Sequence, residues 1–368
     1  MKVPFVDLKA QYKNYQTELD QAITSVINET AFVGGSNNKF VIKFESEFAE
    51  YLGQKHVVTC ANGTDSLEIL LEAYDIGNED EVLVPALTWI STSEAVGRRG
   101  AKPVFVDIEK DTLLMDISLI EEKITSKTKA IIPVHLYGNV VNMKLIMEIA
   151  AKYKLVVIED CAQSHGAKFD NKLAGTYGHA SSFSFYPGKN LGAYGDAGAI
   201  STNDDKIASK CRMIANHGQL KKHEHLIEGR NSRLDGIHAA VLSVKLKYLN
   251  HWNDSRVKIA ETYSKLLKSN IQLPVVNQNA KHVYHLFVIR TDKRDELKKY
   301  LEEIGIETAI HYPTPLPLLK SYSHLKLNES NFPIACMQSK YILSIPMFPE
   351  LSDEQVYFIS SSINEFVS

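Results

Sequence analysis

The amino-acid sequence predicts an α/β protein with a large domain around a mainly parallel sheet, followed by a smaller α+β domain. Two observations lead to this prediction. Short apolar runs, most of them rich in β-branched residues, alternate with amphipathic segments of helical length through the first two thirds of the chain. The 368 residues also exceed what one ordinary hydrophobic core organises, and a hydrophobic content of 44% is ample for two cores.

About seven apolar runs are the expected strands of the large sheet. Because helix-length segments separate most of them, these strands are expected to run mainly parallel. The last two runs follow each other too closely for a crossover helix, so we expect that pair to be antiparallel. The runs are residues 56–60, 81–85, 103–108, 130–137, 155–160, 182–186 and 198–202.

The last third of the chain has a different pattern. Residues 242–260 predict one long helix that bridges two domains. A strand-like run at 285–289 and a helical pattern at 294–304 then predict a small α+β unit. We therefore divide the chain into a large domain of residues 1–250, which includes the N-terminal segment, and a small C-terminal domain of residues 251–368.

Charge and cysteine usage exclude several classes of protein. A net charge of −3, from 41 basic and 44 acidic residues, is not typical of proteins that bind nucleic acid or membrane surfaces. Cys60, Cys161, Cys211 and Cys336 lack CxxC spacing, which argues against a metal site or a disulfide framework and suits a reducing cytosol. The start lacks the apolar run of a signal peptide, and no stretch approaches the roughly 20 apolar residues of a membrane span. We therefore expect a soluble, cytoplasmic protein without a metal.

Two strand ends carry an acid and an amine. Asp160 ends one apolar run, and Lys189 follows another in a Gly-rich bend. Ligands of such sheets bind at the carboxyl ends of the strands. An amine that forms a Schiff base and an acid that keeps a ring nitrogen protonated are what pyridoxal 5'-phosphate requires. The plain alternatives are a turn or cap role for Asp160 and a solvated loop position for Lys189.

A phosphate site requires free backbone N–H groups, and the best candidate is the segment 61–66. It follows the first strand and opens a helix, whose N-terminus favours an anion. Gly63 permits close approach, and Thr64 adds a hydroxyl group. The alternative is an ordinary helix cap. The presence of both Asp160 and Lys189 favours the phosphate interpretation.

Two further side chains are candidates for contact with the cofactor ring. Gln163 follows Asp160 by three positions and is placed to reach the ring hydroxyl. Trp89 belongs either to the core, as most tryptophans do, or to the face of the ring. A nicotinamide-dependent dehydrogenase is excluded, because no G-x-G-x-x-G follows the first strand.

Several ordered motifs resemble the DegT/DnrJ/EryC1/StrS aminotransferases of nucleotide sugars. The resemblance covers nearly the whole chain and implies the type I fold of PLP-dependent transferases, which is that of aspartate aminotransferase. The motifs are Phe-Val-Asp-Leu at 5–8, Asn-Gly-Thr-Asp at 62–65, Pro-Val-His-Leu-Tyr-Gly at 133–138, Glu-Asp-Cys-Ala-Gln-Ser-His-Gly at 159–166, Ser-Phe-Tyr-Pro-Gly-Lys-Asn-Leu-Gly at 184–192, Gly-Arg-Asn-Ser-Arg-Leu-Asp at 229–235, His-Tyr-Pro at 311–313 and Leu-Ser-Ile-Pro-Met at 343–347.

The resemblance implies a role for each residue of the cofactor site. Lys189 would bind the cofactor covalently and then act as the acid and base of proton transfer. Asp160 would pair with the pyridinium nitrogen, Gln163 would contact the phenolic oxygen, and Trp89 would stack on the ring.

The same resemblance assigns further residues to the binding of the phosphate and of the sugar. Gly63, Thr64 and Ser184 would hold the phosphate, and Asn231 would be donated to it by the neighbouring subunit. A homodimer with shared active sites is therefore implied. The candidates for the sugar side are Tyr186, His311 and Tyr312.

The stretch 190–196 resembles the subgroup that acts on 3-keto-6-deoxyhexoses. The implied reaction moves the amino group of L-glutamate to a dTDP-3-keto-6-deoxyhexose and yields a dTDP-3-amino-3,6-dideoxyhexose for a surface glycan or a natural product. A UDP-linked 3-keto sugar and a 4-keto sugar stay open. Family members that dehydrate the sugar carry histidine in place of the lysine. The presence of Lys189 therefore argues against a dehydratase. A regulatory or scaffold protein is the alternative from another class, and the intact set of cofactor residues argues against it.

Overall fold

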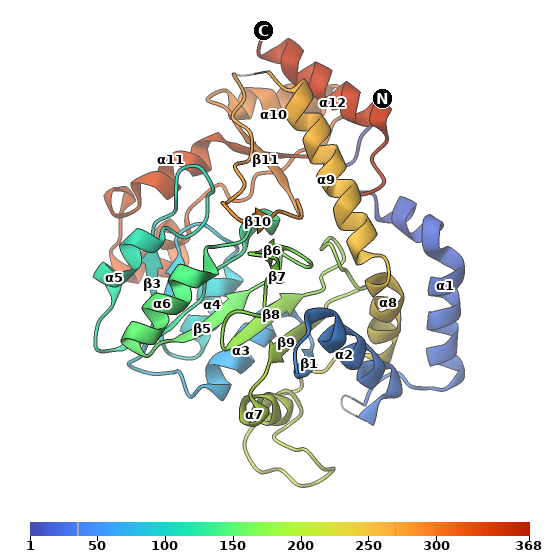
Figure 1. Ribbon diagram of the computed structural model, residues 1–368, viewed down its shortest axis with the longest axis vertical. Helices are drawn as coiled ribbons and strands as arrows, with labels where there is room; N and C mark the ends of the chain where they lie inside the picture. The colour runs from blue at the N-terminus through green and yellow to red at the C-terminus, as the bar shows by residue number, and fades with distance from the viewer. Residues whose placement is uncertain (35–36, 269) are drawn as a thin grey trace.

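The computed structural model describes residues 1–34, 37–268 and 270–368 (Figure 1). Over these residues, a seven-stranded sheet with strand order β1-β9-β8-β5-β4-β2-β3 forms the centre. The five strands from β8 to β3 in this order are parallel, and β9 is antiparallel to both β8 and β1. The predicted mainly parallel sheet and the antiparallel last pair are both confirmed. The strands are β1 His56–Cys60, β2 Glu81–Pro85, β3 Lys102–Val106, β4 Thr128–Ile131, β5 Val156–Asp160, β8 Ala180–Ser184 and β9 Gly198–Thr202.

The predicted strand at 130–137 is wrong in its second half. Strand β4 ends at Ile131, and the chain continues as an irregular buried segment into the short helix η3, Leu136–Gly138. Pro133 has no N–H group to donate to a strand ladder, although its carbonyl accepts a bond of 2.9 Å from the N–H of Asp160. The pattern also missed the three-stranded sheet β10-β6-β7, because each strand is two residues long: β6 Lys168–Phe169, β7 Lys172–Leu173 and β10 Ala280–Lys281.

Helices cover the central sheet and bury its apolar side chains in one large core. Figure 1 shows α2 beside β1, with α8 next to α2 and α1 on the outer side of α8. Phe48 of α2 reaches the sheet, where its ring lies 5.0 Å from that of Phe183 and 5.4 Å from that of Phe185. The helices of this region are α1 Leu8–Asn28, α2 Lys39–Leu52, α3 Gly63–Ala73, α4 Ser91–Arg98, η2 Ile117–Leu119, α5 Ile120–Lys123, α6 Met143–Tyr153, α7 Asp205–Ala215 and α8 Gly236–Leu246.

The single long helix predicted at 242–260 is wrong. The chain forms α8 and then α9, Leu249–Leu266, with a break at Lys247 and Tyr248. The ring of Tyr248 packs 4.2 Å from that of Tyr15, and its hydroxyl donates to Glu18. These contacts hold the break, so α8 packs with the large core while α9 reaches a second one. The alternation of apolar residues continues through the break, and the local pattern therefore does not reveal it.

The second core lies between α9, α10, α12 and a two-stranded antiparallel sheet, β11-β12. Val3 belongs to this core and pairs with Ile306, so the first residues of the chain pack beside the last third. Residues after 250, such as Leu316 and Phe332, in turn pack into the large core. The division at residue 250 stays a prediction. The remaining elements are β11 Phe287–Arg290, α10 Arg294–Glu303, η4 Leu316–Leu318, η5 Lys320–Leu325, η6 Glu329–Asn331, α11 Pro333–Tyr341, β12 Ile342–Ile345 and α12 Asp353–Phe366.

No helix in the described part of the chain combines the length and the apolar character needed to cross a membrane.

Candidate active site

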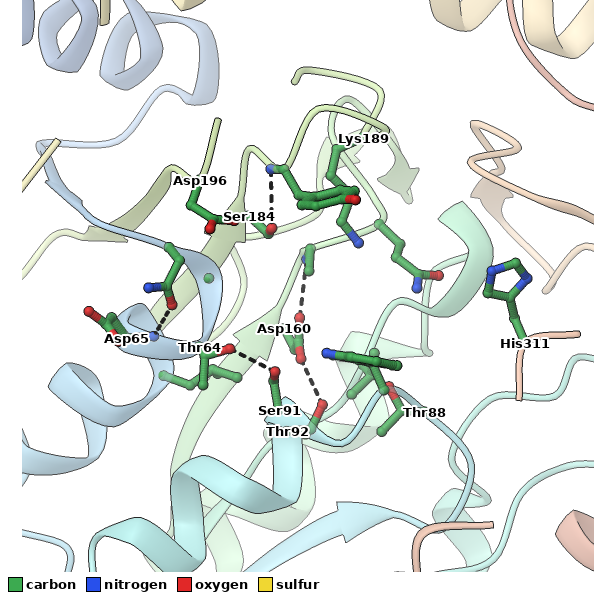
Figure 2. Close-up of a pocket in the computed structure, with 18 of the residues that line it drawn as sticks. Thr64, Asp65, Thr88, Ser91, Thr92, Asp160, Ser184, Lys189, Asp196 and His311 are labelled. Atoms are coloured by element: carbon green, nitrogen blue, oxygen red, sulfur yellow. Dashed lines mark hydrogen bonds between the residues drawn. The ribbon is translucent and has the colours of Figure 1, made fainter. Parts of the chain in front are cut away.

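A cavity of about 730 Å³ opens at the carboxyl ends of β5 and β8, beside the N-termini of α3 and α4. Every predicted site residue except Asn231 lines it. Figure 2 shows Thr64, Ser91 and Asp160 near one another, with Lys189 above Asp160 in the view and His311 at the right. Residues far apart in the sequence thus meet in one place, as expected for strand ends of an α/β sheet.

Asp160 carries a buried charge without an ion pair. Its side chain is only 5% exposed, and it accepts hydrogen bonds of 2.9 Å from the Thr92 hydroxyl and 3.1 Å from the N–H of Ala162. Within residues 1–34, 37–268 and 270–368, no basic nitrogen lies within 4.0 Å of its carboxylate. Burial raises the pKa of Asp160, whereas these hydrogen bonds and the charge of Lys189 act in the opposite direction. A cationic N–H group of a ligand would complete this site.

Lys189 lies in the turn after β8, where its N–H donates to the carbonyl of Tyr186 at 2.8 Å. Close packing shapes this turn, since a side chain at Gly192 would place its Cβ 2.3 Å from the carbonyl oxygen of Pro187. Burial lowers the pKa of Lys189 to about 8, although the charge of Asp160 acts to raise it. Near neutral pH, a much larger fraction of this amine than of an ordinary lysine is therefore neutral and nucleophilic.

The N-terminus of α3 forms an anion cradle. The side chain of Asn62 caps the helix by accepting a hydrogen bond from the N–H of Asp65, at 2.8 Å. The N–H groups of Gly63 and Thr64 have no hydrogen-bond partner in the described chain. The Thr64 hydroxyl lies 2.7 Å from that of Ser91 at the start of α4. A Cβ at Gly63 would stand 2.6 Å from the Cβ of Ser184, so only glycine lets α3 approach β8 this closely.

Gln163 and Trp89 border the middle of the cavity. The Gln163 carbonyl accepts from the N–H of Tyr137 at 2.7 Å, and its amide donates to the Tyr312 hydroxyl at 3.2 Å. Trp89 is 57% exposed, and its ring lies 5.6 Å from that of Tyr312. Of the two interpretations of Trp89, the core residue is therefore wrong, and its ring is available to a ligand.

Tyr186 and His311 also line the cavity. Tyr186 is exposed, and His311 stacks on Phe5 with 5.7 Å between ring centres. The Nδ1 atom of His311 lies 2.8 Å from the hydroxyl of Ser344. Burial, with a smaller contribution from the charge of Lys189, lowers the pKa of His311 to about 4, so the ring is neutral at physiological pH.

Asn231 lies outside this cavity. It is exposed on a loop, where its side-chain oxygen accepts from Nε of Arg233 at 3.1 Å. Its assignment to the site of a neighbouring subunit stays a prediction.

Comparison with known proteins identifies the family. The profile of the DegT/DnrJ/EryC1/StrS aminotransferase family matches residues 13–364. The chain belongs to this family.

Individual relatives match over their full lengths. A protein of Aneurinibacillus thermoaerophilus called dTDP-3-amino-3,6-dideoxy-alpha-D-galactopyranose transaminase is 44% identical, over 99% of each chain. A pleiotropic regulatory protein of Geobacillus stearothermophilus is also 44% identical, over 100% of this chain and 99% of the relative. The crystal structure of S. venezuelae DesV in complex with a ketimine intermediate is 39% identical, with a TM-score of 0.97 over 100% of this chain and 99% of that one. The predicted family and fold class are confirmed.

Other residues of this aminotransferase site were not predicted from the sequence. Thr92 supports the carboxylate of Asp160, Ser91 contacts Thr64, and Thr88 and Asp196 also line the cavity. The hydroxyl-rich stretch 91–93 after Trp89 is the sequence feature that indicates further side chains in the site. It was missed because serine and threonine at a helix start are usually caps.

A buried trio, His135, Glu159 and Cys161, has atoms close enough to hold a metal ion. However, the Glu159 carboxylate already accepts from the N–H groups of Gly175 at 2.8 Å, Tyr177 at 2.7 Å and Gly178 at 2.6 Å, and it lies 3.0 Å from Nε2 of His135. Its lone pairs are occupied by the protein, so we assign the trio to the stability of the fold.

Proposed function

We propose that this chain is a PLP-dependent aminotransferase that moves the amino group of L-glutamate to a nucleotide-linked keto sugar. The proposed sugar is a dTDP-3-keto-6-deoxyhexose, and the product is a dTDP-3-amino-3,6-dideoxyhexose. The observation that carries the proposal is the buried Asp160, which has no ion-pair partner among the described residues and shares one cavity with the amine of Lys189. A buried carboxylate without an ion pair costs folding free energy, and proteins retain such arrangements chiefly at functional sites.

The residues present fit PLP at three points. The uncompensated carboxylate of Asp160 suits a pyridinium N–H, the free N–H groups of Gly63 and Thr64 suit a phosphate, and Lys189 suits an aldehyde. Ser184 packs against Gly63 and adds a hydroxyl to the phosphate end. When bound, PLP supplies a ring that withdraws electrons from the carbon that bears the amino group.

The protein's own side chains would perform the remaining steps. Lys189, with a pKa of about 8, is matched to accept and return a proton near neutral pH. The Gln163 amide would orient the ring by a hydrogen bond to its oxygen, and Trp89 would cover one face. The neutral His311 and the hydroxyl groups of Tyr186 and Tyr312 would contact the sugar.

The stretch 190–196 supports amination at C3, as does the 44% identical relative called a dTDP-3-amino-3,6-dideoxy-alpha-D-galactopyranose transaminase. We further propose a cytoplasmic homodimer in which Asn231 of each chain completes the phosphate site of its partner. The relative called a pleiotropic regulatory protein favours a second candidate, a regulatory protein on the same fold. The proposed PLP ligands that line the cavity argue for catalysis in this chain.

The test is to incubate the purified protein with PLP, L-glutamate and a panel of dTDP- and UDP-linked 3-keto and 4-keto sugars. NMR of the product then locates the new C–N bond. We expect a visible cofactor band that shifts on addition of glutamate, and amination of the dTDP-3-keto sugar. Lys189→Ala serves as the inactive control. A wild-type protein with no glutamate-dependent shift would favour the regulatory candidate, and amination at C4 or of the UDP sugar would correct the substrate.

A further inference from the structure

A second cavity, of about 240 Å³, meets the first at the reacting lysine. Lys189, Gln163 and Tyr312 line both cavities, as do Tyr186 and His311. The second cavity is far smaller than the first, which suits a small molecule and not a nucleotide sugar. No acidic side chain lines it in the described part of the chain, whereas Lys189 and Arg256 contribute two cationic groups.

Arg256 of α9 is held rigidly at this cavity. Its side chain is 4% exposed, and Nη1 donates to the carbonyl groups of Met347 at 2.7 Å, Tyr284 at 3.0 Å and His285 at 3.3 Å. These bonds join α9 to two segments that are distant in the sequence. The guanidinium plane is therefore oriented before any ligand arrives.

Arg256 forms no ion pair with any other side chain in the described part of the protein. Over residues 1–34, 37–268 and 270–368, no carboxylate oxygen lies within 4.0 Å of its guanidinium group, and Nε is buried without a hydrogen-bond partner. Glu350 is the nearby acid, but it neither pairs with Arg256 nor lines the cavity. Burial lowers the pKa of Arg256 to about 10, so the group stays charged at neutral pH. A buried cation without a counter-ion is costly, and an anionic ligand would relieve that cost.

Arg294 is a second buried arginine, and it differs from Arg256 because it has a counter-ion. Its Nη1 donates to the carbonyl groups of Ser339 at 3.2 Å and Ile342 at 3.3 Å. Its Nε, however, pairs with the carboxylate of Asp295 at 2.5 Å. Arg294 is thus a structural arginine with a counter-ion within the protein, and it does not line the cavity.

We propose that Arg256 binds a carboxylate of the amino donor in this second cavity. The inference rests on the proposed function. The amine of the donor must reach the position where Lys189 acts, and both carboxylates of L-glutamate are a few bonds from that amine. A planar guanidinium group with an unused N–H matches a carboxylate in geometry and charge. The donor and the larger nucleotide sugar would then be recognised by different parts of the joined cavities.

The test compares Arg256→Gln, Arg256→Lys and the matched control Arg294→Gln. Single-turnover absorbance measurements give the half-reaction with L-glutamate, and the second half-reaction, which passes the amino group on, is followed with the keto sugar. For Arg256→Gln, half-saturation by glutamate should need about 10- to 100-fold more glutamate, because a charge-assisted bond is lost. The keto-sugar half-reaction should be unchanged, Arg256→Lys should show an intermediate loss, and Arg294→Gln should resemble wild type in both.

A binding measurement adds a readout that does not depend on turnover. Glutarate has two carboxylates and no amine, so its affinity for the full-length protein can be measured by calorimetry. We expect wild type and Arg294→Gln to bind glutarate, and Arg256→Gln to bind it at least about 10-fold more weakly.

Several outcomes would overturn the assignment. An Arg256→Gln protein that uses glutamate as well as wild type would place the carboxylate elsewhere, and equal losses in both half-reactions would make Arg256 a structural residue. If Arg256→Gln does not fold, the same two criteria apply to Arg256→Lys. A wild-type protein that does not react with glutamate would instead contradict the proposed function.

Discussion

Asp160 holds a negative charge that the described chain does not neutralise, and this predicts an unusual pair of effects for Asp160→Asn. The amide keeps the size of the side chain but loses the charge-assisted bond to a ring nitrogen. We expect PLP still to bind, with the glutamate half-reaction slowed by about 10- to 100-fold. Stopped-flow absorbance measures that rate. Glu121→Gln, which changes a surface acid outside the cavity, is the control and should react nearly as wild type does.

The same substitution should stabilise the cofactor-free protein. Because the folded protein raises the pKa of Asp160 above its ordinary 3.8, the ionised side chain opposes folding at neutral pH. A neutral amide removes that penalty, so cofactor-free Asp160→Asn should unfold at a higher temperature than wild type at pH 7. A lower unfolding temperature would mean that the carboxylate supports the fold.

The low pKa of Lys189 predicts the pH dependence of PLP uptake. Only the neutral amine attacks an aldehyde, so the rate of uptake by the cofactor-free protein should rise about tenfold per pH unit and level off above about 8. An unshifted lysine would give a rise that continues to about pH 10.4. In Asp160→Asn the inflection should move to lower pH, because the charge of Asp160 acts to raise the pKa of Lys189. Stopped-flow absorbance from pH 6 to 10 checks both curves.

Strand β5 places two neighbouring acids in different roles. Successive side chains of a strand point to opposite faces, so Asp160 reaches the cavity while Glu159 points away from it. Burial acts to raise the pKa of Glu159, but the hydrogen bond and charge of His135 and the N–H groups of Gly178 and Gly175 outweigh it and lower the pKa. Glu159 thereby anchors the segment 175–178 to the central sheet.

We expect Glu159→Gln to destabilise the protein by about 3–5 kcal/mol, since it breaks a buried charged network and turns an amide toward N–H donors. Differential scanning calorimetry should show a clearly lower unfolding temperature. Glu121→Gln is the control, because Glu121 pairs with Lys152 at 2.9 Å on the surface, where solvent screens the charges and the pair contributes little to stability. Equal unfolding temperatures for the two variants would contradict the assigned role of Glu159.

At the scale of the whole molecule, we expect two chains to form each active site. Asn231 does not line the cavity of its own chain, yet the family resemblance assigns it to a phosphate. If it serves the partner, a mixture of Lys189→Ala and Asn231→Ala chains contains heterodimers in which one site has both residues intact. Aminotransferase activity should then exceed that of either variant alone. Native mass spectrometry verifies that the subunits have exchanged, and heterodimers without any gain in activity would show that each site is complete within one chain.

Most of the large sheet could be predicted because short runs of apolar, β-branched residues indicate where strands form. The runs at 56–60 and 81–85 match β1 and β2 residue for residue, and the short connection between β8 and β9 correctly predicted an antiparallel pair. The pattern failed at Pro133 and at Tyr248. At Pro133 the missing backbone N–H interrupts the strand, which a count of apolar residues does not register, whereas at Tyr248 contacts with Tyr15 and Glu18 decide where the helix ends.

The site could be predicted where a residue's type and its place at a strand end together imply chemistry, as for Lys189 and Asp160. Arg256 could not, because nothing in the periodicity of α9 distinguishes it from a solvated helix residue. The sequence by itself determined the α/β sheet, the family and the residues that gather at the strand ends. Only the tertiary structure decided that Arg256 meets Met347 and the carbonyl groups of 284–285 beside Lys189. The physical reason is that periodicity reports which face of an element is buried, whereas uncompensated charges and cavities depend on which distant segments pack against it.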